Sequence, residues 1–267
     1  MMRRFHKMHG LGNDFALFDA REEPLAMSET LARAIADRRT GIGCDQVILL
    51  GPSRIADLAM RIFNADGGEV EACGNASRCV ALLVGGRPAI ETAGGVIAAS
   101  ADAAGISIDM GAPRFGWDEM PLAYAMDTEA MPVGWEDLHD PAAVNVGNPH
   151  VIFFVPDADA VPLDRLGPQI ERDPLFPGRV NVNVASVTDG AIRLRVWERG
   201  AGLTRACGTG ACATAVAAIR RKLVTSPVTV HLPGGALEID WQPDGTIRMT
   251  GPATHVYEGE IDLETLA

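Results

Sequence analysis

The feature that most constrains the fold of this chain is an internal repeat built around two cysteines. Residues 72–79 are Ala-Cys-Gly-Asn-Ala-Ser-Arg-Cys, and residues 206–212 are Ala-Cys-Gly-Thr-Gly-Ala-Cys. Three further pairs of polar residues keep the same offset of 134 or 135 positions: Asn13 with Asn148, Gln46 with Asn181, and Asn64 with Glu198. Four landmarks at one offset predict two homologous halves.

Each half has the same order of expected elements. Alternating apolar residues at 58–64 and 192–198 predict a strand that ends at Asn64 in one half and at Glu198 in the other. Each Cys-Gly pair is followed by a run of small and apolar residues, which is typical of a helix buried on all sides. We therefore predict an α+β fold of two homologous domains. Each would be a curved, mostly antiparallel sheet wrapped around a central helix, with the active site in the interdomain cleft. The expected domains are residues 1–118, completed by 257–267, and residues 119–256.

Composition excludes several classes of function. A net charge of −12 argues against a nucleic-acid partner, which requires basic patches. The apolar runs are too short to span a membrane and no signal peptide is visible, so we expect no membrane partner and a cytoplasmic location. The only lysines, Lys7 and Lys222, lie outside any glycine-rich context, which argues against pyridoxal phosphate, and we expect no cofactor. No metal is expected either, because five histidines lack metal-ligand spacing: His6, His9, His139, His231 and His255.

The two cysteines suggest a specific chemistry. A thiol directly before a helix lies beside free N–H groups and the positive end of the helix dipole, which would lower its pKa. One thiolate and one thiol on opposite sides of a carbon could remove a proton from one face and deliver one to the other. Backbone N–H groups at the two helix starts would hold the neighbouring carboxylate, and these positions are Gly74, Asn75, Gly208 and Thr209.

The remaining polar residues match an amino-acid ligand. Uncharged amides donate and accept hydrogen bonds without competing for the proton, and five are available: Asn13, Gln46, Asn64, Asn148 and Asn181. Glu198 and Arg199 add one charge of each sign, as a zwitterion requires.

Six motifs resemble those of the diaminopimelate epimerase family. They are Gly-Asn-Asp-Phe at 12–15, Gly-Cys-Asp-Gln at 43–46, Ala-Cys-Gly-Asn at 72–75, Gly-Asn-Pro-His at 147–150, Trp-Glu-Arg-Gly at 197–200 and Ala-Cys-Gly-Thr-Gly-Ala at 206–211. The resemblance runs from about residue 5 to residue 260. It implies a cofactor-independent enzyme that interconverts LL- and meso-diaminopimelate for lysine and peptidoglycan precursor biosynthesis, usually as a homodimer.

Carried over residue by residue, the resemblance implies that Cys73 and Cys207 are the proton donor/acceptor pair. It makes His150 and Glu198 the residues that assist at the reacting centre. The substrate-binding positions would be Asn13, Gln46, Asn64, Gly74, Asn75, Asn148, Asn181, Glu198, Arg199, Gly208 and Thr209, with Asn64, Asn181 and Arg199 at the distal end of the substrate. Two residues depart from the family pattern. Ala76 replaces a glycine and Leu203 replaces a glutamate, neither at a catalytic or ligand position.

Three other functions fit parts of the pattern. A proline or hydroxyproline racemase on the same fold would use two cysteines, but proline lacks the second polar end that Glu198 and Arg199 indicate. A thiol redox protein could form a reversible Cys73–Cys207 disulfide, but no Cys-x-x-Cys motif is present and the amides would be unexplained. A non-catalytic amino-acid binding protein would bind the ligand without exchanging its α-hydrogen.

Overall fold

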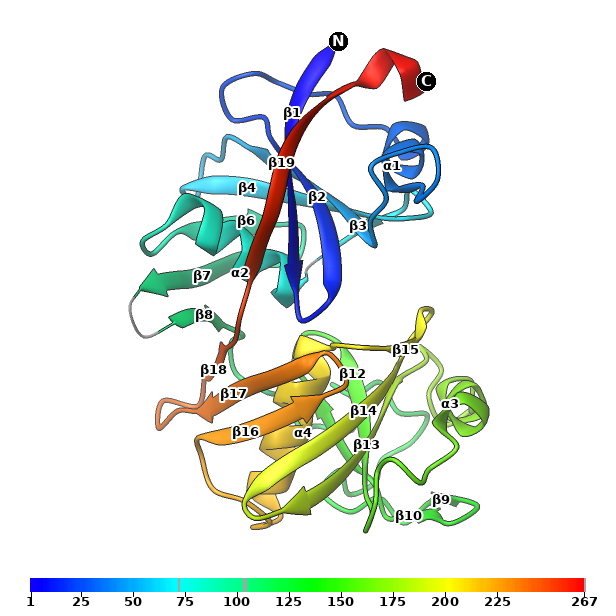
Figure 1. Ribbon diagram of the computed structural model, residues 1–267. Helices are drawn as coiled ribbons and strands as arrows, with labels where there is room; N and C mark the ends of the chain where they lie inside the picture. Colours follow the sequence, from blue (N-terminus) through cyan, green and yellow to red (C-terminus); the bar gives the residue numbers. More distant parts are fainter. Residues whose placement is uncertain (72, 103–104, 267) are drawn as a thin grey trace. The chain divides into compact units, whose positions relative to one another are not determined.

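The computed structural model describes residues 1–71, 73–102 and 105–266. Ala72, the first residue of the first Cys-Gly motif, and Ala267, the last residue of the 257–267 segment, lie outside the described residues. The chain folds into two compact units, Met1–Ile108 with Gly251–Ala267 and Asp109–Thr250 (Figure 1). The domains expected from the sequence, residues 1–118 with 257–267 and residues 119–256, are defined by the homologous halves and not by compactness. These limits stay a prediction.

The first unit is one sheet with two helices. Its strands are β1 (Met2–Gly10), β2 (Asn13–Asp19), β3 (Gln46–Gly51), β4 (Leu58–Asn64), β5 (Glu69–Val70), β6 (Ala89–Thr92), β7 (Gly95–Asp102), β8 (Gly105–Asp109) and β19 (Thr254–Asp262). They are ordered β19-β1-β2-β3-β4-β6-β7-β8, with β5 beside β4. The pairs β2–β3 and β4–β6 are parallel and the others are antiparallel. The helices are α1 (Glu29–Ala36) and α2 (Gly74–Val84), and a short 3-10 turn, η1 (Leu263–Leu266), follows β19.

The second unit repeats this plan. Its strands are β11 (Ala142–Asn145), β12 (Pro149–Phe154), β13 (Asn181–Thr188), β14 (Ala191–Glu198), β15 (Gly202–Thr204), β16 (Val228–Leu232), β17 (Gly235–Trp241) and β18 (Ile247–Thr250), with a separate hairpin of β9 (Gly134–Trp135) and β10 (Leu138–His139). The order β11-β12-β13-β14-β16-β17-β18, parallel at β12–β13 and β14–β16, matches β1-β2-β3-β4-β6-β7-β8 strand for strand. Helices α3 (Leu163–Glu171) and α4 (Gly208–Arg220) correspond to α1 and α2. The predicted α+β fold of two homologous halves is therefore confirmed.

The two central helices explain why the sheets curve. Helix α4 packs against every strand of the main sheet of its unit, and all its residues from Gly208 to Ala218 except Thr209 are buried. Helix α2 packs against β1, β7 and β19 and is buried from Asn75 to Ala81. A helix that is apolar all round can be covered only by a sheet that wraps it. Helix α4 ends at Arg220.

Helices α1 and α3 cover the opposite faces of the sheets and close a second core in each unit. Ser28 caps α1 by accepting a hydrogen bond from the Leu31 N–H (3.1 Å). Ile35 of α1 lies in one of these cores and Ile170 of α3 in the other. None of the helices in the described ranges is long and apolar enough to cross a membrane.

The turn from α1 into β3 leaves no room for a side chain at Gly41, and this gives a test of the packing. A Cβ atom at Gly41 would lie 2.1 Å from the Ala34 carbonyl oxygen, whereas a Cβ atom at Gly51, at the end of β3, would have no neighbour within 4 Å. We predict that Gly41→Ala lowers the free energy of unfolding by about 1–3 kcal/mol, because the backbone must shift. Gly51→Ala should change it by less than about 0.5 kcal/mol. Urea unfolding followed by circular dichroism measures both, and equal midpoints for the two variants would contradict this account.

Candidate active site

Cys73 is the N-cap of α2, and its thiol faces an ordered pair of amides. The Cys73 Sγ donates to Asn13 Oδ1 at 3.8 Å, and Asn75 Nδ2 donates to the same oxygen at 3.1 Å. Asn75 Oδ1 in turn accepts from a guanidinium N–H of Arg78 (2.7 Å), a fully buried side chain that also donates to a backbone carbonyl of its own unit. Arg78 therefore fixes the Asn75 amide, which fixes the oxygen of Asn13 toward Cys73.

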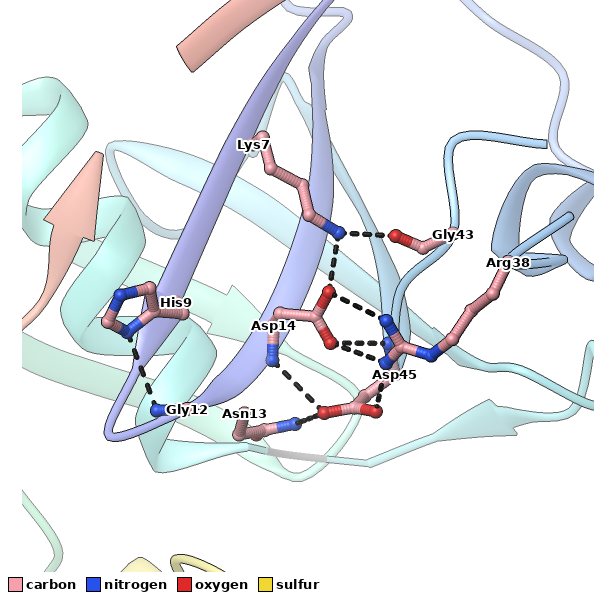
Figure 2. Close-up of polar contacts among 8 residues, drawn as sticks. All are labelled: Lys7, His9, Gly12, Asn13, Asp14, Arg38, Gly43 and Asp45. Carbon is pink, nitrogen blue, oxygen red and sulfur yellow. Dashed lines mark hydrogen bonds and ion pairs between the residues drawn. The ribbon is translucent and has the colours of Figure 1, made fainter. Parts of the chain in front are cut away.

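A network of charged side chains holds the other end of the Asn13 amide (Figure 2). Asn13 Nδ2 donates to Asp45 Oδ2 at 3.1 Å. Arg38 donates to Asp45 Oδ1 and to Asp14 Oδ1, both at 2.7 Å, and Lys7 pairs with Asp14 Oδ2 at 2.5 Å. Burial raises the pKa of Asp14, but hydrogen bonds and charges from Arg38 and Lys7 outweigh it and hold the pKa at about 2. The Asp14 carboxylate therefore stays ionised and accepts from both cations.

Gln46 and Asn64 lie opposite each other at the paired ends of β3 and β4. Gln46 Nε2 donates to Asn64 Oδ1 at 2.9 Å. Gln46 Oε1 is buried and has no hydrogen-bond partner among the residues that the structure describes. A buried acceptor without a donor is costly, so this oxygen indicates a donor supplied by a ligand.

Cys207 is the N-cap of α4 and lies in a different environment from Cys73. Its Sγ accepts from the Gly210 N–H at 3.3 Å and lies 3.5 Å from Thr209 Oγ1. Glu198 accepts from the Thr204 hydroxyl and from the Cys207 thiol. Only 4% of Cys207 is exposed, against partial exposure for Cys73.

The environment of Cys207 outweighs the effect that the sequence predicts for a helix N-terminus. Burial raises the pKa of Cys207 well above its usual range, and the Glu198 charge raises it further. Hydrogen bonds from Thr209 and Gly210 lower it, but by less. The N–H group at the helix start thus lowers this pKa as predicted, but burial and Glu198 outweigh it, so Cys207 keeps its proton at neutral pH. Burial also raises the pKa of Glu198.

His150 is fully buried and orients the Asn148 amide. His150 Nε2 lies 2.9 Å from Asn148 Oδ1, and its Nδ1 lies 3.1 Å from Asn183 Nδ2, which also donates to the Val151 carbonyl oxygen (3.0 Å). His150 Nδ1 must therefore accept, and Nε2–H must donate to Asn148. Burial lowers the pKa of His150 to about 3, so the ring is neutral. Asn148 Nδ2 then donates to Thr209 Oγ1 at 3.3 Å.

Asn181 fixes the start of the loop that carries Arg199. Asn181 Oδ1 accepts from the Arg199 N–H at 2.9 Å, and the Arg199 guanidinium donates to the Gly178 carbonyl oxygen at 3.0 Å. A buried carboxylate anchors the same loop. Glu171 accepts from Trp197 Nε1 (2.8 Å) and from the backbone N–H that follows Arg199 (3.2 Å).

The predicted residues thus divide between the two units. The first unit holds Cys73, Gly74, Asn75, Asn13, Gln46 and Asn64, and the second holds Cys207, Gly208, Thr209, Asn148, His150, Asn181, Glu198 and Arg199. Gly74 and Gly208 are the first residues of α2 and α4. Sequence reasoning missed the supporting residues: Arg38, Asp45, Arg78, Glu171 and Asn183. Two of them had a signal: Asp45 lies inside the Gly-Cys-Asp-Gln motif, and Arg78 lies inside the cysteine motif of residues 72–79.

Comparison with known proteins identifies relatives along nearly the whole chain. The sequence model of the family described as diaminopimelate epimerase matches residues 5–116 and 142–256. The chain is 66% identical over 265 residues to the diaminopimelate epimerase of Rhizorhabdus wittichii, covering 98% of this chain and 97% of that protein. It is also 66% identical over 260 residues to the diaminopimelate epimerase of Erythrobacter litoralis, covering 97% of each.

Solved structures extend the likeness in fold to more distant proteins. A PhzF-family phenazine biosynthesis protein of Enterococcus faecalis is similar with a TM-score of 0.74 at 15% identity, covering 98% of this chain and all (100%) of that one. A hydroxyproline epimerase from Agrobacterium vitis, solved with bound trans-4-hydroxy-L-proline, is similar with a TM-score of 0.67 at 16% identity, covering 97% and 91%. At these identities the likeness shows a shared fold alone.

The contrast between the two thiols predicts different reactivities. We expect iodoacetamide at pH 7.5 to label Cys73 before Cys207, because each unit of raised pKa lowers the thiolate fraction about tenfold. Labelling of Cys207 should increase as the pH is raised. Peptide mapping by mass spectrometry measures both rates, with buried Cys44 as an internal control because burial raises its pKa to about 11. Equal labelling rates for Cys73 and Cys207 at pH 7.5 would contradict the assignment.

Proposed function

The chain belongs to the diaminopimelate epimerase family, and from this premise we propose that Cys73 and Cys207 are the two groups that invert the α-carbon of 2,6-diaminopimelate. The reaction is the interconversion of the LL and meso isomers. One observation supports the assignment of these two cysteines. Each thiol is the N-cap of a buried helix at equivalent positions of the repeat, and each has hydrogen-bonding side chains beside it.

Inversion of the α-carbon takes two proton transfers, each involving a different proton. In the structure the Cys73 thiol donates to Asn13 Oδ1. Once it has released that proton to solvent, the Cys73 thiolate takes the α-hydrogen as a proton, and the electron pair of the broken C–H bond stays on the α-carbon. The thiol of Cys207 then delivers its proton to the opposite face of that carbon and becomes a thiolate. The raised pKa of Cys207 supports this starting state, and the reverse direction starts with the proton on Cys73. Glu198 accepts a hydrogen bond from the Cys207 thiol and orients it.

The carbanion requires stabilisation through the neighbouring carboxylate. The first N–H groups of a helix lack partners within that helix and lie at the positive end of its dipole. Gly74 and Asn75 begin α2, and Gly208 and Thr209 begin α4. We infer that these backbone groups bind the reacting carboxylate and stabilise the charge that moves onto it.

The distal end of the substrate is an ammonium and a carboxylate. The buried Gln46 Oε1 supports binding of the distal ammonium, because it needs a donor and is joined to Asn64. Arg199 supplies a guanidinium for the distal carboxylate, on a loop that Asn181 fixes. His150 acts through Asn148 in this scheme and stays neutral throughout.

We also propose a cytoplasmic homodimer, as the family resemblance implies. Strand β19 presents two large exposed apolar side chains, Val256 and Tyr257, which supports an interface on this strand. Light scattering of the purified chain tests the dimer by its mass in solution.

The two-thiol mechanism predicts solvent exchange at the α-carbon. In D2O, proton NMR of LL-diaminopimelate with reduced enzyme should show loss of the α-proton signal and growth of the meso isomer. Cys73→Ser and Cys207→Ser should each slow turnover by at least about 100-fold, because a positioned acid or base contributes that much. Cys212→Ala, on the same helix as Cys207, serves as the control and should stay active. Exchange of proline in place of diaminopimelate would favour the racemase, and no exchange in folded protein would refute the mechanism.

The charged network predicts an effect from a residue outside the reacting groups. Asp45→Ala removes the acceptor that fixes the Asn13 amide, and we expect kcat/KM to fall about 10- to 100-fold, as the loss of a hydrogen bond to a charged group would cause. The fold should persist, as judged by circular dichroism. Asp137→Asn, an exposed carboxylate in the β9–β10 hairpin, is the matched control and should leave kcat/KM unchanged. An unaltered kcat/KM in Asp45→Ala would exclude this positioning role.

A further inference from the structure

Strands from the two ends of the chain bring a cluster of metal-ligand side chains together in the first unit. β1 and β19 pair in antiparallel fashion, and they lie side by side as the blue and red strands of Figure 1. His6 Nδ1 lies 3.0 Å from His255 Nε2 and 3.7 Å from Glu258 Oε2. One ligand atom from each of the three side chains lies within 4.8 Å of the others.

A β-bulge is what places the three side chains on one face. His255 and Glu258 are three positions apart, so in a regular strand they would point to opposite faces of the sheet. The pairing shifts register between Lys7 and Met8, and His255 falls opposite Met8 while Glu258 falls opposite His6. The extra residue returns both side chains to the face of His6. Bulges of this kind often re-aim a side chain toward a site.

The two separations from His6 Nδ1 are close to those of a tetrahedral zinc site. With Zn–N bonds of about 2.0–2.1 Å, the distance between two ligand atoms along an edge of the tetrahedron is about 3.3 Å. The separations of 3.0 and 3.7 Å lie on either side of that value. Two imidazoles and one carboxylate are also a common ligand set for Zn²⁺.

We propose that His6, His255 and Glu258 bind one divalent transition-metal ion of the Zn²⁺ type, with a water molecule at the fourth position. The His6 side chain is 17% exposed and lies beneath the ion, while His255 and Glu258 are more exposed in the single chain and flank the proposed dimer contact at Val256 and Tyr257. The ion would join the first strand of the chain to the last long strand, so binding would stabilise the first unit. The site is separate from the reacting thiols and does not depend on the proposed reaction.

One neighbouring cation competes with the metal. Arg4 pairs with the same Glu258 oxygen, and Glu260 lies opposite Arg4 in the strand register. Asp19 also faces His6, but it is paired with Arg21. Removal of the Arg4 charge should therefore strengthen metal binding.

Cobalt titration of the full-length chain tests the site. Chelator-treated, reduced protein at pH 7.5 should bind one Co²⁺ per chain with weak visible bands of nitrogen and oxygen ligands, and Zn²⁺ should displace it. His6→Asn and His255→Asn should each lower the affinity by at least about 10-fold, and Arg4→Gln should raise it. His231→Asn, an exposed histidine on β16, is the control and should leave the affinity unchanged. Zn²⁺ should raise the melting temperature of the wild type but not that of His6→Asn.

Three results would overturn the proposal. The first is no stoichiometric binding of Co²⁺ or Zn²⁺. The second is an affinity that both histidine substitutions leave unaltered. The third is a cobalt spectrum dominated by sulfur charge-transfer bands that disappear in Cys73→Ser, which would assign the ion to a thiol.

Discussion

The rest of the structure depends on burying a helix on all sides while keeping its first turn polar. Helices α2 and α4 have apolar and small residues around most of their circumference, so each sheet must curve around its helix. A helix start cannot be covered in the same way, because its first N–H groups lack partners within the helix. Cysteine at the N-cap, followed by glycine, puts a thiol beside these N–H groups. The candidate reactive thiol of each unit therefore lies at the N-terminus of its central helix.

The two units keep one backbone plan but differ in the side chains behind the thiols. The contact of Asn13 with Asn75 in one unit corresponds to that of Asn148 with Thr209 in the other. The side chains that support these contacts differ between the two units. Phe15 of the first unit corresponds in the repeat to the buried His150, and Asp45 corresponds to the apolar Val180. A charged network therefore supports one amide and a neutral imidazole supports the other. The two thiols therefore lie in different environments, and in the proposed mechanism Cys73 accepts a proton while Cys207 donates one.

Much of the candidate site could be predicted from sequence because its residues recur in the repeat. A polar residue that recurs at a fixed offset, although its sequence neighbours differ, is needed in both halves. This argument identified Cys73, Cys207 and the amides. Supporting residues such as Arg78 and Asn183 occur in one half only. Their roles arise from contacts across the sheet and helix, which a single sequence does not reveal. The polar residues missed by the sequence are those whose partners are specific to one unit.

The sequence by itself determined the α+β class, the duplication, the helices that begin at the two cysteines and the family. These features follow from periodicity and spacing, which are local properties of the chain. Only the tertiary structure decided the protonation of Cys207, because a pKa depends on every group packed around the thiol. It also decided that His6 and His255, nearly 250 residues apart, lie within hydrogen-bond distance. Strand pairing and a bulge create that proximity, and no spacing along the chain encodes it.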